Sequence, residues 1–478
     1  MFKSTPNARL GFLTTRSFAA GAGIILSLYS AVFAKTPEIA PQFAWATSAG
    51  GLKNDKIRGV AVDREGNVFV AGEAAGDVKL GSGPDSRSMK GRGESDFFLA
   101  KLDPNGRFLW TRMAGGGLID RGYGVATDAK GNCYVTGHYQ STDADFSGTK
   151  LPHRGGYDLF VAKYDRDGNL AWIKTAGGKG YDFGHALALD EQGNVVVSGA
   201  VEGEAEFAGT SFPNQSGTRT FCAKYRPDGT LIWAKVATGE ARGAGQGVAV
   251  DRRGNIYIAG HNTGVGQFGQ KPLVTRGGTA AMLIKLSASG DTLSTTQHVG
   301  EPSFHFHEVT CDPEGRVWAV GMFRGKVTIG NETITSSGET DKDALVCHYG
   351  ADGKLRWWRA GKGTGIDYAL GVATDGAGNS FITGEFSAQF RMGGEELSSQ
   401  GGTDIYVAKF DEKGALRWLA QGGGKGSDNA YSMACDIQGN LLLAGSYTGT
   451  ANFDRASITS TTRDLFVAKL NGKSTASR

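Results

Sequence analysis

Short apolar runs separated by turn residues repeat along the whole chain. Residues 59–62 form one run, a turn Asp-x-x-Gly-Asn occupies 63–67, and a second run covers 67–72. In the next copy of the pattern, a third run at 158–164 is followed by the tight turn 165–169 and a fourth run at 170–172. These runs are rich in Val, Phe, Tyr and Ile and are bounded by Gly, Asp and Asn, which is typical of strands and hairpin turns. The pattern predicts an all-β chain built from units of four short strands.

The turn motif returns every 61 to 65 residues. A fixed period of this length is the sequence signature of a repeat architecture. Its first residue is Asp63, Asp128, Asp190, Asp251, Asp375 or Asp436, and a copy that begins at Asp312 carries Arg316 in place of Asn. We therefore expect seven units, which start near residues 57, 122, 184, 245, 306, 369 and 430.

The two ends of the repeat region complement each other. Residues 42–47 resemble a lone fourth strand, whereas the chain ends shortly after a third strand at 464–469. We therefore predict that residues 35–478 form a seven-bladed β-propeller with four-stranded blades, in which the N-terminal strand completes the last blade and closes the ring. A tryptophan recurs on the fourth strand, and we expect these side chains to pack between blades: Trp45, Trp110, Trp172, Trp233, Trp357 and Trp418.

The repeated motif resembles a known family. The strings Gly-Val-Ala-x-Asp-x-x-Gly-Asn, as at 59–67, and Gly-Gly-x-Asp-x-x-Val-Ala-Lys, as at 155–163, are similar to the bacterial seven-bladed β-propeller repeat, or SBBP repeat. The resemblance extends over residues 42–470. It implies an exported propeller, in a family whose members mostly lack an assigned activity, and it transfers no catalytic residue because the repeated motif is structural.

Charge and composition separate the N-terminus from the rest. The 478 residues include 75 glycines and have a net charge of +3, and residues 1–34 contain three basic residues and no acid. An apolar stretch that ends in Val32-Phe33-Ala34 follows the basic region, so we predict a secretory signal peptide at 1–34, with an uncleaved anchor as the alternative. The remainder is electrically neutral, which argues against nucleic-acid binding. We expect a monomer in the periplasm, cell envelope or exterior that does not insert into the membrane after signal removal.

The variable positions of the repeat indicate where a ligand would bind. The loops after the second strand and the glycine-rich crossovers vary, whereas the hairpin turns at the other edge are uniform, and function usually resides on variable loops. Two aligned columns of dissimilar, often polar residues lie there, although free drift of loop-edge positions is the alternative reading. The candidates at the start of the first strand are Arg58, Tyr123, His185, Gln246, His307 and Tyr431, and those after the second strand are Glu73, His138, His261 and Glu385.

Other chemistry is weakly indicated. His305 and His307 are two residues apart, and with Glu308 or His261 they are weak candidates for metal ligands. The Asp-rich turns lack the downstream Glu of an EF-hand calcium loop. The five cysteines form no CxxC pair and are expected in the core, and the lysine that recurs on the third strand is expected to make a structural contact. We predict no cofactor.

Two classes of function remain. The first is an exported protein that binds a protein or carbohydrate partner on its variable-loop face without catalysis. The second, by analogy with lyases on seven-bladed propellers, is a secreted polysaccharide-active enzyme with its site at the mouth of the central channel. Residues available for that chemistry are Arg58, Tyr123, His138, His185 and Tyr431. An assembly role in the envelope is a third possibility.

Overall fold

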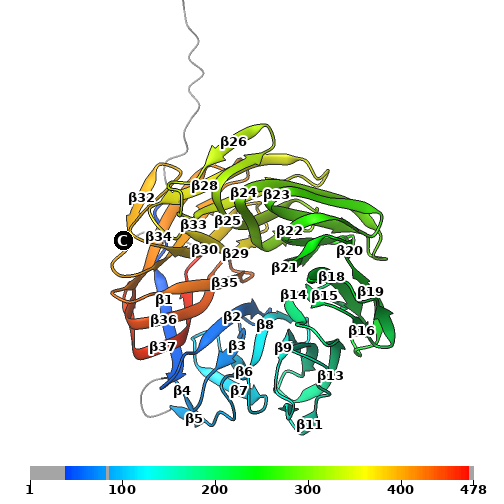
Figure 1. Cartoon of the computed structure of the whole chain (residues 1–478). Coiled ribbons are helices and arrows are strands. Elements are labelled where there is room, and N and C mark those ends of the chain that lie inside the picture. Colours follow the sequence, from blue (N-terminus) through cyan, green and yellow to red (C-terminus); the bar gives the residue numbers. More distant parts are fainter. Residues whose placement is uncertain (1–37, 82–85, 473–478) are drawn as a thin grey trace, which may run out of the picture. The chain divides into compact units, whose positions relative to one another are not determined.

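The computed structural model describes residues 38–81 and 86–472 (Figure 1). The predicted signal segment 1–34 lies outside these residues. The described chain is all β, as predicted: every pairing between its named strands is antiparallel, and it contains no helix. Within this part of the chain there is accordingly no helix that could span a membrane.

The strands pair in sets of four, in the order first, second, third and fourth. In the first set, β2 (Lys56–Val62), β3 (Val68–Ala74), β6 (Asp96–Leu102) and β7 (Phe108–Ala114) lie side by side. The next sets are β8 (Asp120–Thr127), β9 (Cys133–Tyr139), β12 (Asp158–Tyr164) and β13 (Leu170–Gly177); β14 (Phe183–Leu189), β15 (Val195–Glu202), β18 (Thr218–Tyr225) and β19 (Leu231–Val236); and β21 (Arg242–Val250), β22 (Ile256–Phe268), β23 (Lys271–Leu286) and the first half of β24 (Thr292–Cys311).

The remaining sets follow the same order. They are the second half of β24 with β25 (Val317–Ile329), β27 (Asp343–Tyr349) and β28 (Leu355–Gly363); β29 (Tyr368–Thr374), β30 (Ser380–Phe386), β33 (Asp404–Phe410) and β34 (Leu416–Gly424); and β35 (Asn429–Cys435), β36 (Leu441–Phe453), β37 (Ala456–Leu470) and β1 (Phe43–Gly51). Short strands decorate the loops: β4 (Val78–Leu80), β5 (Arg87–Met89), β10 (Asp145–Phe146), β11 (Thr149–Lys150), β16 (Ala205–Phe207), β17 (Thr210–Phe212), β20 (Thr238–Gly239), β26 (Glu332–Thr335), β31 (Gln389–Met392) and β32 (Glu395–Ser398).

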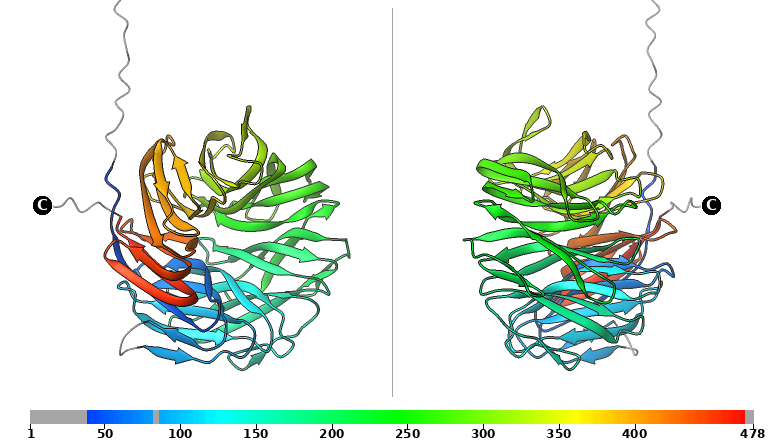
Figure 2. Two further views of the ribbon diagram at one scale, coloured as in Figure 1. Left: turned by 60° about the vertical axis from the view of Figure 1, so that its left-hand side comes forward. Right: turned by 90° about the vertical axis from the view of Figure 1, so that its right-hand side faces the viewer.

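The strand nearest the N-terminus pairs with the last strand of the chain. Ala46 of β1 lies opposite Ala468 of β37, and Ala49 lies opposite Leu465. The blue β1 and the red β37 run side by side in both views of the ribbon (Figures 1 and 2). The set that ends the sequence therefore takes its fourth strand from the beginning of the sequence.

One crossover differs from the repeat. β24 runs without interruption from the fourth strand of one set into the first strand of the next, where a glycine-rich loop is expected. The reason lies in Phe304, which stands where five of the other crossovers have a buried Asp and one has Gly243. Its ring is buried and packs edge-to-face on Phe306 with centroids 5.1 Å apart. An apolar side chain cannot accept the crossover amides, so the backbone satisfies them by continuing its pairing with β25.

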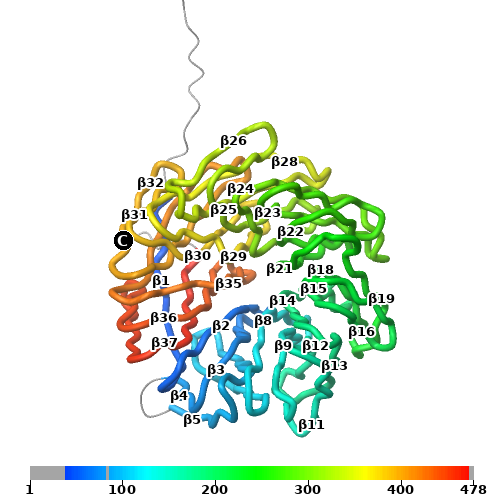
Figure 3. The backbone as a smooth tube through the Cα atoms, viewed as in Figure 1, coloured from blue at the N-terminus to red at the C-terminus, as the bar shows by residue number. Residues whose placement is uncertain are grey.

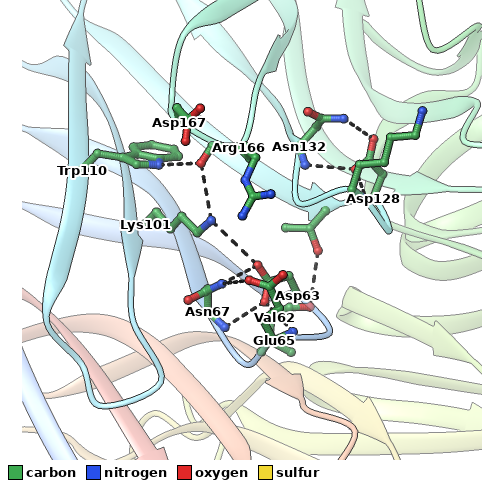
Figure 4. A network of polar contacts seen from close by, with 12 residues as sticks. Val62, Asp63, Glu65, Asn67, Lys101, Trp110, Asp128, Asn132, Arg166 and Asp167 are labelled. Atoms are coloured by element: carbon green, nitrogen blue, oxygen red, sulfur yellow. Dashed lines mark hydrogen bonds and ion pairs between the residues drawn. The ribbon is translucent and has the colours of Figure 1, made fainter.

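The repeated polar residues tie neighbouring sets together (Figure 4). The Asp63 carboxylate accepts hydrogen bonds from the backbone and side-chain nitrogens of Asn67, each at 2.9 Å. Lys101 donates to the carbonyl of Arg166 in the next set at 3.4 Å, and the Trp110 indole donates to the same carbonyl at 3.1 Å. The turn aspartate and the recurring lysine therefore make structural contacts.

The core lies between adjacent sets. Phe69 and Phe97 of the first set belong to the same buried cluster as Val135 and Phe160 of the second. All five cysteines are free, and Cys133, Cys222 and Cys347 are buried. Because each set covers the face of the next, the sheets support one another.

Candidate functional site

Antiparallel pairing gathers the variable positions at one edge of each sheet. The start of the first and third strands and the end of the second and fourth strands lie at this edge, which we call the loop face. The first strands β2, β8, β14, β21, β29 and β35 lie nearest the centre of the molecule (Figures 1 and 3). Their early residues therefore face the middle of the described unit.

A buried carboxylate between two arginines anchors one side of the loop face. Arg58 donates to Glu73 at 2.7 Å, and Arg121 donates to the other carboxylate oxygen. The hydroxyl of Ser95 donates to it as well, at 3.2 Å. Burial alone would raise the pKa of Glu73, but the two guanidinium groups outweigh it and hold the pKa below its usual value. Glu73 is therefore a carboxylate at neutral pH, engaged with both arginines.

An aromatic and histidine cluster continues from Arg58. Its guanidinium lies 4.7 Å from the ring centroid of Tyr123, whose ring is 5.3 Å from His138 and 5.6 Å from His185. Burial lowers the pKa of His138 well below its ordinary value and that of His185 to about 4. His185 Nδ1 lies 3.3 Å from the carbonyl of Gly245, which favours the tautomer protonated at Nδ1 and leaves Nε2 as a hydrogen-bond acceptor.

A second histidine cluster lies on the sets formed by β21–β24 and β24–β28. His261 stacks on His305 with ring centroids 4.6 Å apart, and His305 lies 6.4 Å from His307. The His307 ring contacts Tyr368, whose hydroxyl accepts a hydrogen bond from Lys342 at 2.6 Å. Burial lowers the pKa of His261 to about 3 and that of His307 to about 4.

This second cluster does not make a metal centre. Across residues 38–81 and 86–472 no group of three or more His, Cys, Asp or Glu side chains is placed to hold a metal ion. The stacked rings of His261 and His305 pack face to face rather than directing nitrogens at one point. The weak metal hypothesis for His305 and His307 therefore gains no support from their geometry.

The remaining candidates are Gln246, Glu385 and Tyr431. Gln246 is half-buried on β21. Burial raises the pKa of Glu385 to about 7, although nearby Arg463 and Lys342 oppose that shift. The Tyr431 hydroxyl lies 3.5 Å from the Asn429 side-chain oxygen and 3.5 Å from the Ser446 hydroxyl. Arg58, Glu73, Tyr123, His138 and His185 are thus brought together, as are His261, His305 and His307.

Several residues of the loop face were missed by the sequence analysis. They occupy two further aligned columns, one directly after the crossover Asp and one directly before the Asp of the third strand. Because residues two apart on a strand share a face, the first column is the sequence signal that accompanies Arg58 and its equivalents. The missed residues include Lys56, Arg121, Phe183 and Tyr368 in the first column and Ser95, Tyr157, Lys342 and Arg463 in the second.

Comparison with known families agrees with the repeated motif. Residues 44–78 match the model of the beta-propeller repeat, SBBP, which confirms the resemblance found in the sequence. This segment contains all of β1 except Phe43, all of β2 and β3, and the first turn motif.

Individual relatives are distant. An uncharacterized WD repeat-containing protein, L264 of Acanthamoeba polyphaga mimivirus, is 23% identical over 84% of this chain and 35% of its own length. The regulatory protein FlaEY of Caulobacter vibrioides is 24% identical over 78% of this chain and 41% of its own length. The chain thus spans less than half the length of these curated relatives. The crystal structure of the polysaccharide lyase Uly1 superimposes with a TM-score of 0.43 at 12% identity, covering 88% of this chain and 90% of the other.

Proposed function

We propose that this protein is an exported, monomeric seven-bladed β-propeller that binds a protein or carbohydrate partner on its loop face. The pairing of β1 with β37 supports a ring closed by the N-terminal strand. Export rests on the basic and apolar segment at 1–34. The binding role is the function that the loop face supports best.

The cluster around Arg58 carries this proposal. A uniform repeat would present the same side chain at every blade, yet here Arg58, Tyr123 and His185 come from equivalent positions of three successive units and contact in series. Both ring nitrogens of the fully buried His138 lack a hydrogen-bond partner within the described chain. An asymmetric, polar and aromatic surface on a repeating scaffold is what recognition of one defined partner requires.

A thermal-shift screen of the protein against purified polysaccharides, followed by pull-down from an envelope extract, tests the proposal. A ligand present at about 100 times its Kd stabilises the folded state by about 2.7 kcal/mol. We expect Tyr123→Phe or His307→Ala to abolish the response without lowering the melting temperature of the free protein. Tyr225→Phe, at the opposite edge of a third strand, should leave the response unchanged. Full binding by both loop-face variants would refute this location.

A polysaccharide lyase is the second candidate. Nε2 of the neutral His185 is free to accept a proton, and Arg58 lies close enough to Tyr123 to neutralise a substrate carboxylate there. A lyase would generate an unsaturated sugar that absorbs in the ultraviolet. Product formation by the wild type and its loss in His185→Ala would favour the enzyme, whereas binding without product would favour the binding protein.

A further inference from the structure

A cavity opens on the loop face beside the Glu73 ion cluster. It has a volume of about 480 Å³ and lies between the loop before β2, the start of β8 and the middle of β37. This volume is within the range of about 300–1,000 Å³ that small-molecule sites occupy. The charged and polar side chains that line it include Lys53, Lys56, Glu73, Ser95, Arg121 and Thr462.

Positive charge exceeds negative charge around this cavity. Glu73 already holds Arg58 and Arg121, so its carboxylate is engaged. Lys56 is half-buried, and within the described chain its ammonium group has neither a hydrogen bond nor an ion pair. Burial lowers the pKa of Lys56, and the positive charges of Arg58, Arg463 and Arg121 add to that shift, while Glu73 opposes it. An ammonium group in such surroundings is stabilised by an incoming anion.

The cavity wall also suits hydroxyl groups. The hydroxyls of Ser95 and Thr462 donate their protons to Glu73 and to the carbonyl of Gly51, so both oxygens can accept from a ligand hydroxyl. The exposed residues Asn54 and Glu94 present amide and carboxylate groups at the rim. A sugar ring offers hydroxyls that both donate and accept, so mixed donors and acceptors around a cation fit an acidic sugar better than a run of carboxylates on a peptide.

We propose that this cavity binds an acidic polysaccharide, with the ammonium group of Lys56 pairing with a carboxylate or sulfate of one sugar unit. The inference rests on the proposed function, because it names the partner of the same loop face. Lys53 lies at the open side and extends the positive charge toward the solvent. Neutral glucans lack the anion and should not be retained.

Binding of the full chain to four polymers tests this assignment. The probes are polygalacturonate, dextran sulfate, unmodified dextran and poly-L-glutamate, and the readout is affinity by calorimetry at two salt concentrations. We expect binding to polygalacturonate or dextran sulfate, weakening with salt, and no binding to dextran. Lys56→Gln should lower the affinity fivefold or more. Lys354→Gln, which removes an exposed lysine from a turn at the other edge of the sheets, should leave it unchanged.

The outcomes separate this inference from the proposed function. Preference between polygalacturonate and dextran sulfate identifies the anion as carboxylate or sulfate. Tight binding of dextran, preference for poly-L-glutamate, or full affinity of Lys56→Gln would overturn the inference. If affinity is then lost in Tyr123→Phe, the loop face still binds the partner and only the cavity is wrong. If neither variant changes the affinity for a polymer that binds, both the cavity and the loop-face location are wrong.

Discussion

At the scale of single residues, the Glu73 carboxylate is the most demanding feature of the loop face. Its side chain is buried, whereas the side chains of Arg58 and Arg121 remain about a quarter exposed. A buried charge is tolerated only when it is paired and hydrogen-bonded. Here two guanidinium groups and the Ser95 hydroxyl supply those partners, so the buried charge is satisfied and both arginines are held against Glu73.

Replacing Glu73 by Gln should destabilise the protein measurably. The variant leaves two cations beside a neutral amide, and loss of hydrogen bonds to charged groups of this kind lowers stability by about 1–3 kcal/mol. The free energy of unfolding in a denaturant titration checks this value. Glu396→Gln serves as the control, since Glu396 pairs with Arg391 at 3.0 Å on the exposed surface, where such pairs contribute about 0–1 kcal/mol. Equal losses in the two variants would contradict the role assigned to Glu73.

At the scale of the strand and its turn, five of the six fourth-strand tryptophans cover a glycine of the next set. The Cβ of an alanine at Gly414 would lie 2.6 Å from the indole ring of Trp357, and the equivalent position at Gly168 would lie 2.8 Å from Trp110. The set formed by β21–β24 has Ser294 where the others have tryptophan, and the following turn glycine, Gly353, has open space. Absence of the ring and absence of the contact therefore coincide.

Paired substitutions at these glycines separate backbone strain from packing. Both have left-handed backbone conformations, with φ of +76° at Gly414 and +77° at Gly353. In Gly353→Ala the free energy of unfolding should fall by about 1–2 kcal/mol, which is the cost of a left-handed backbone conformation for a residue with a Cβ. Gly414→Ala must also displace Trp357 and should lose about 3 kcal/mol or more. Unfolding midpoints in guanidinium chloride measure both, and identical losses would show that the tryptophan does not pack tightly on the turn.

Most crossovers between sets also contain a buried aspartate, which lies at or directly before the start of the first strand of the next set. Asp367 accepts a hydrogen bond from the backbone of Ser387 at 3.2 Å, while its other carboxylate oxygen and one oxygen of the buried Asp343 lack partners within the described chain. Burial raises the pKa of Asp367 to about 8, and the negative charge of Asp343 adds to this shift. The hydrogen bond from Ser387 opposes it. The folded state therefore holds a proton that the unfolded chain releases near pH 4.

Asp367→Asn should flatten the dependence of stability on alkaline pH. A carboxyl group with a raised pKa favours the folded state at low pH, and this contribution is lost as the pH rises through about 8. Between pH 6 and pH 9 we expect the wild type to lose about 2–3 kcal/mol more than the variant, whose amide does not titrate. Melting curves across that range test this, with the exposed Asp77→Asn as a control. A variant that loses stability as steeply as the wild type would contradict it.

At the scale of the whole molecule, buried histidines and aspartates set opposite limits on pH. His185 and His307 have pKa values of about 4, against an ordinary value of 6.5, so the unfolded chain takes up protons first as the pH falls from 6.5 to about 4. Stability supplied by the neutral histidines is therefore lost in that acidic range, whereas the aspartate contribution is lost on the alkaline side. We expect the melting temperature to be highest near pH 6–7. A monotonic rise or fall between pH 4 and pH 9 would be inconsistent with these shifts.

The repeat predicts the framework better than it predicts the site. Strand order and the roles of Asp63, Lys101 and Trp110 follow from their recurrence, because a residue needed at every unit has a structural task. Contacts within the loop face do not recur, so the repeat does not predict Lys56, Arg121 and Lys342, whose neighbours come from adjacent strands. The continuous strand β24 was likewise missed, since only packing shows that Phe304 turns inward where other units bury a carboxylate.

Removal of β1 tests whether the chain forms a closed ring. In the described residues β1 covers the edge of β37, from the pair Phe43 and Leu470 to the pair Ala49 and Leu465. Without β1, the backbone groups of this edge and the hydrophobic cluster around Leu465 and Val467 would be exposed. A chain beginning at residue 52 should melt at a much lower temperature than one beginning at residue 38. A synthetic peptide of residues 38–51 should restore stability by pairing with β37 in trans. If the shorter chain is as stable as the longer one, or gains nothing from the peptide, the last set does not depend on the N-terminal strand and the closed ring is wrong.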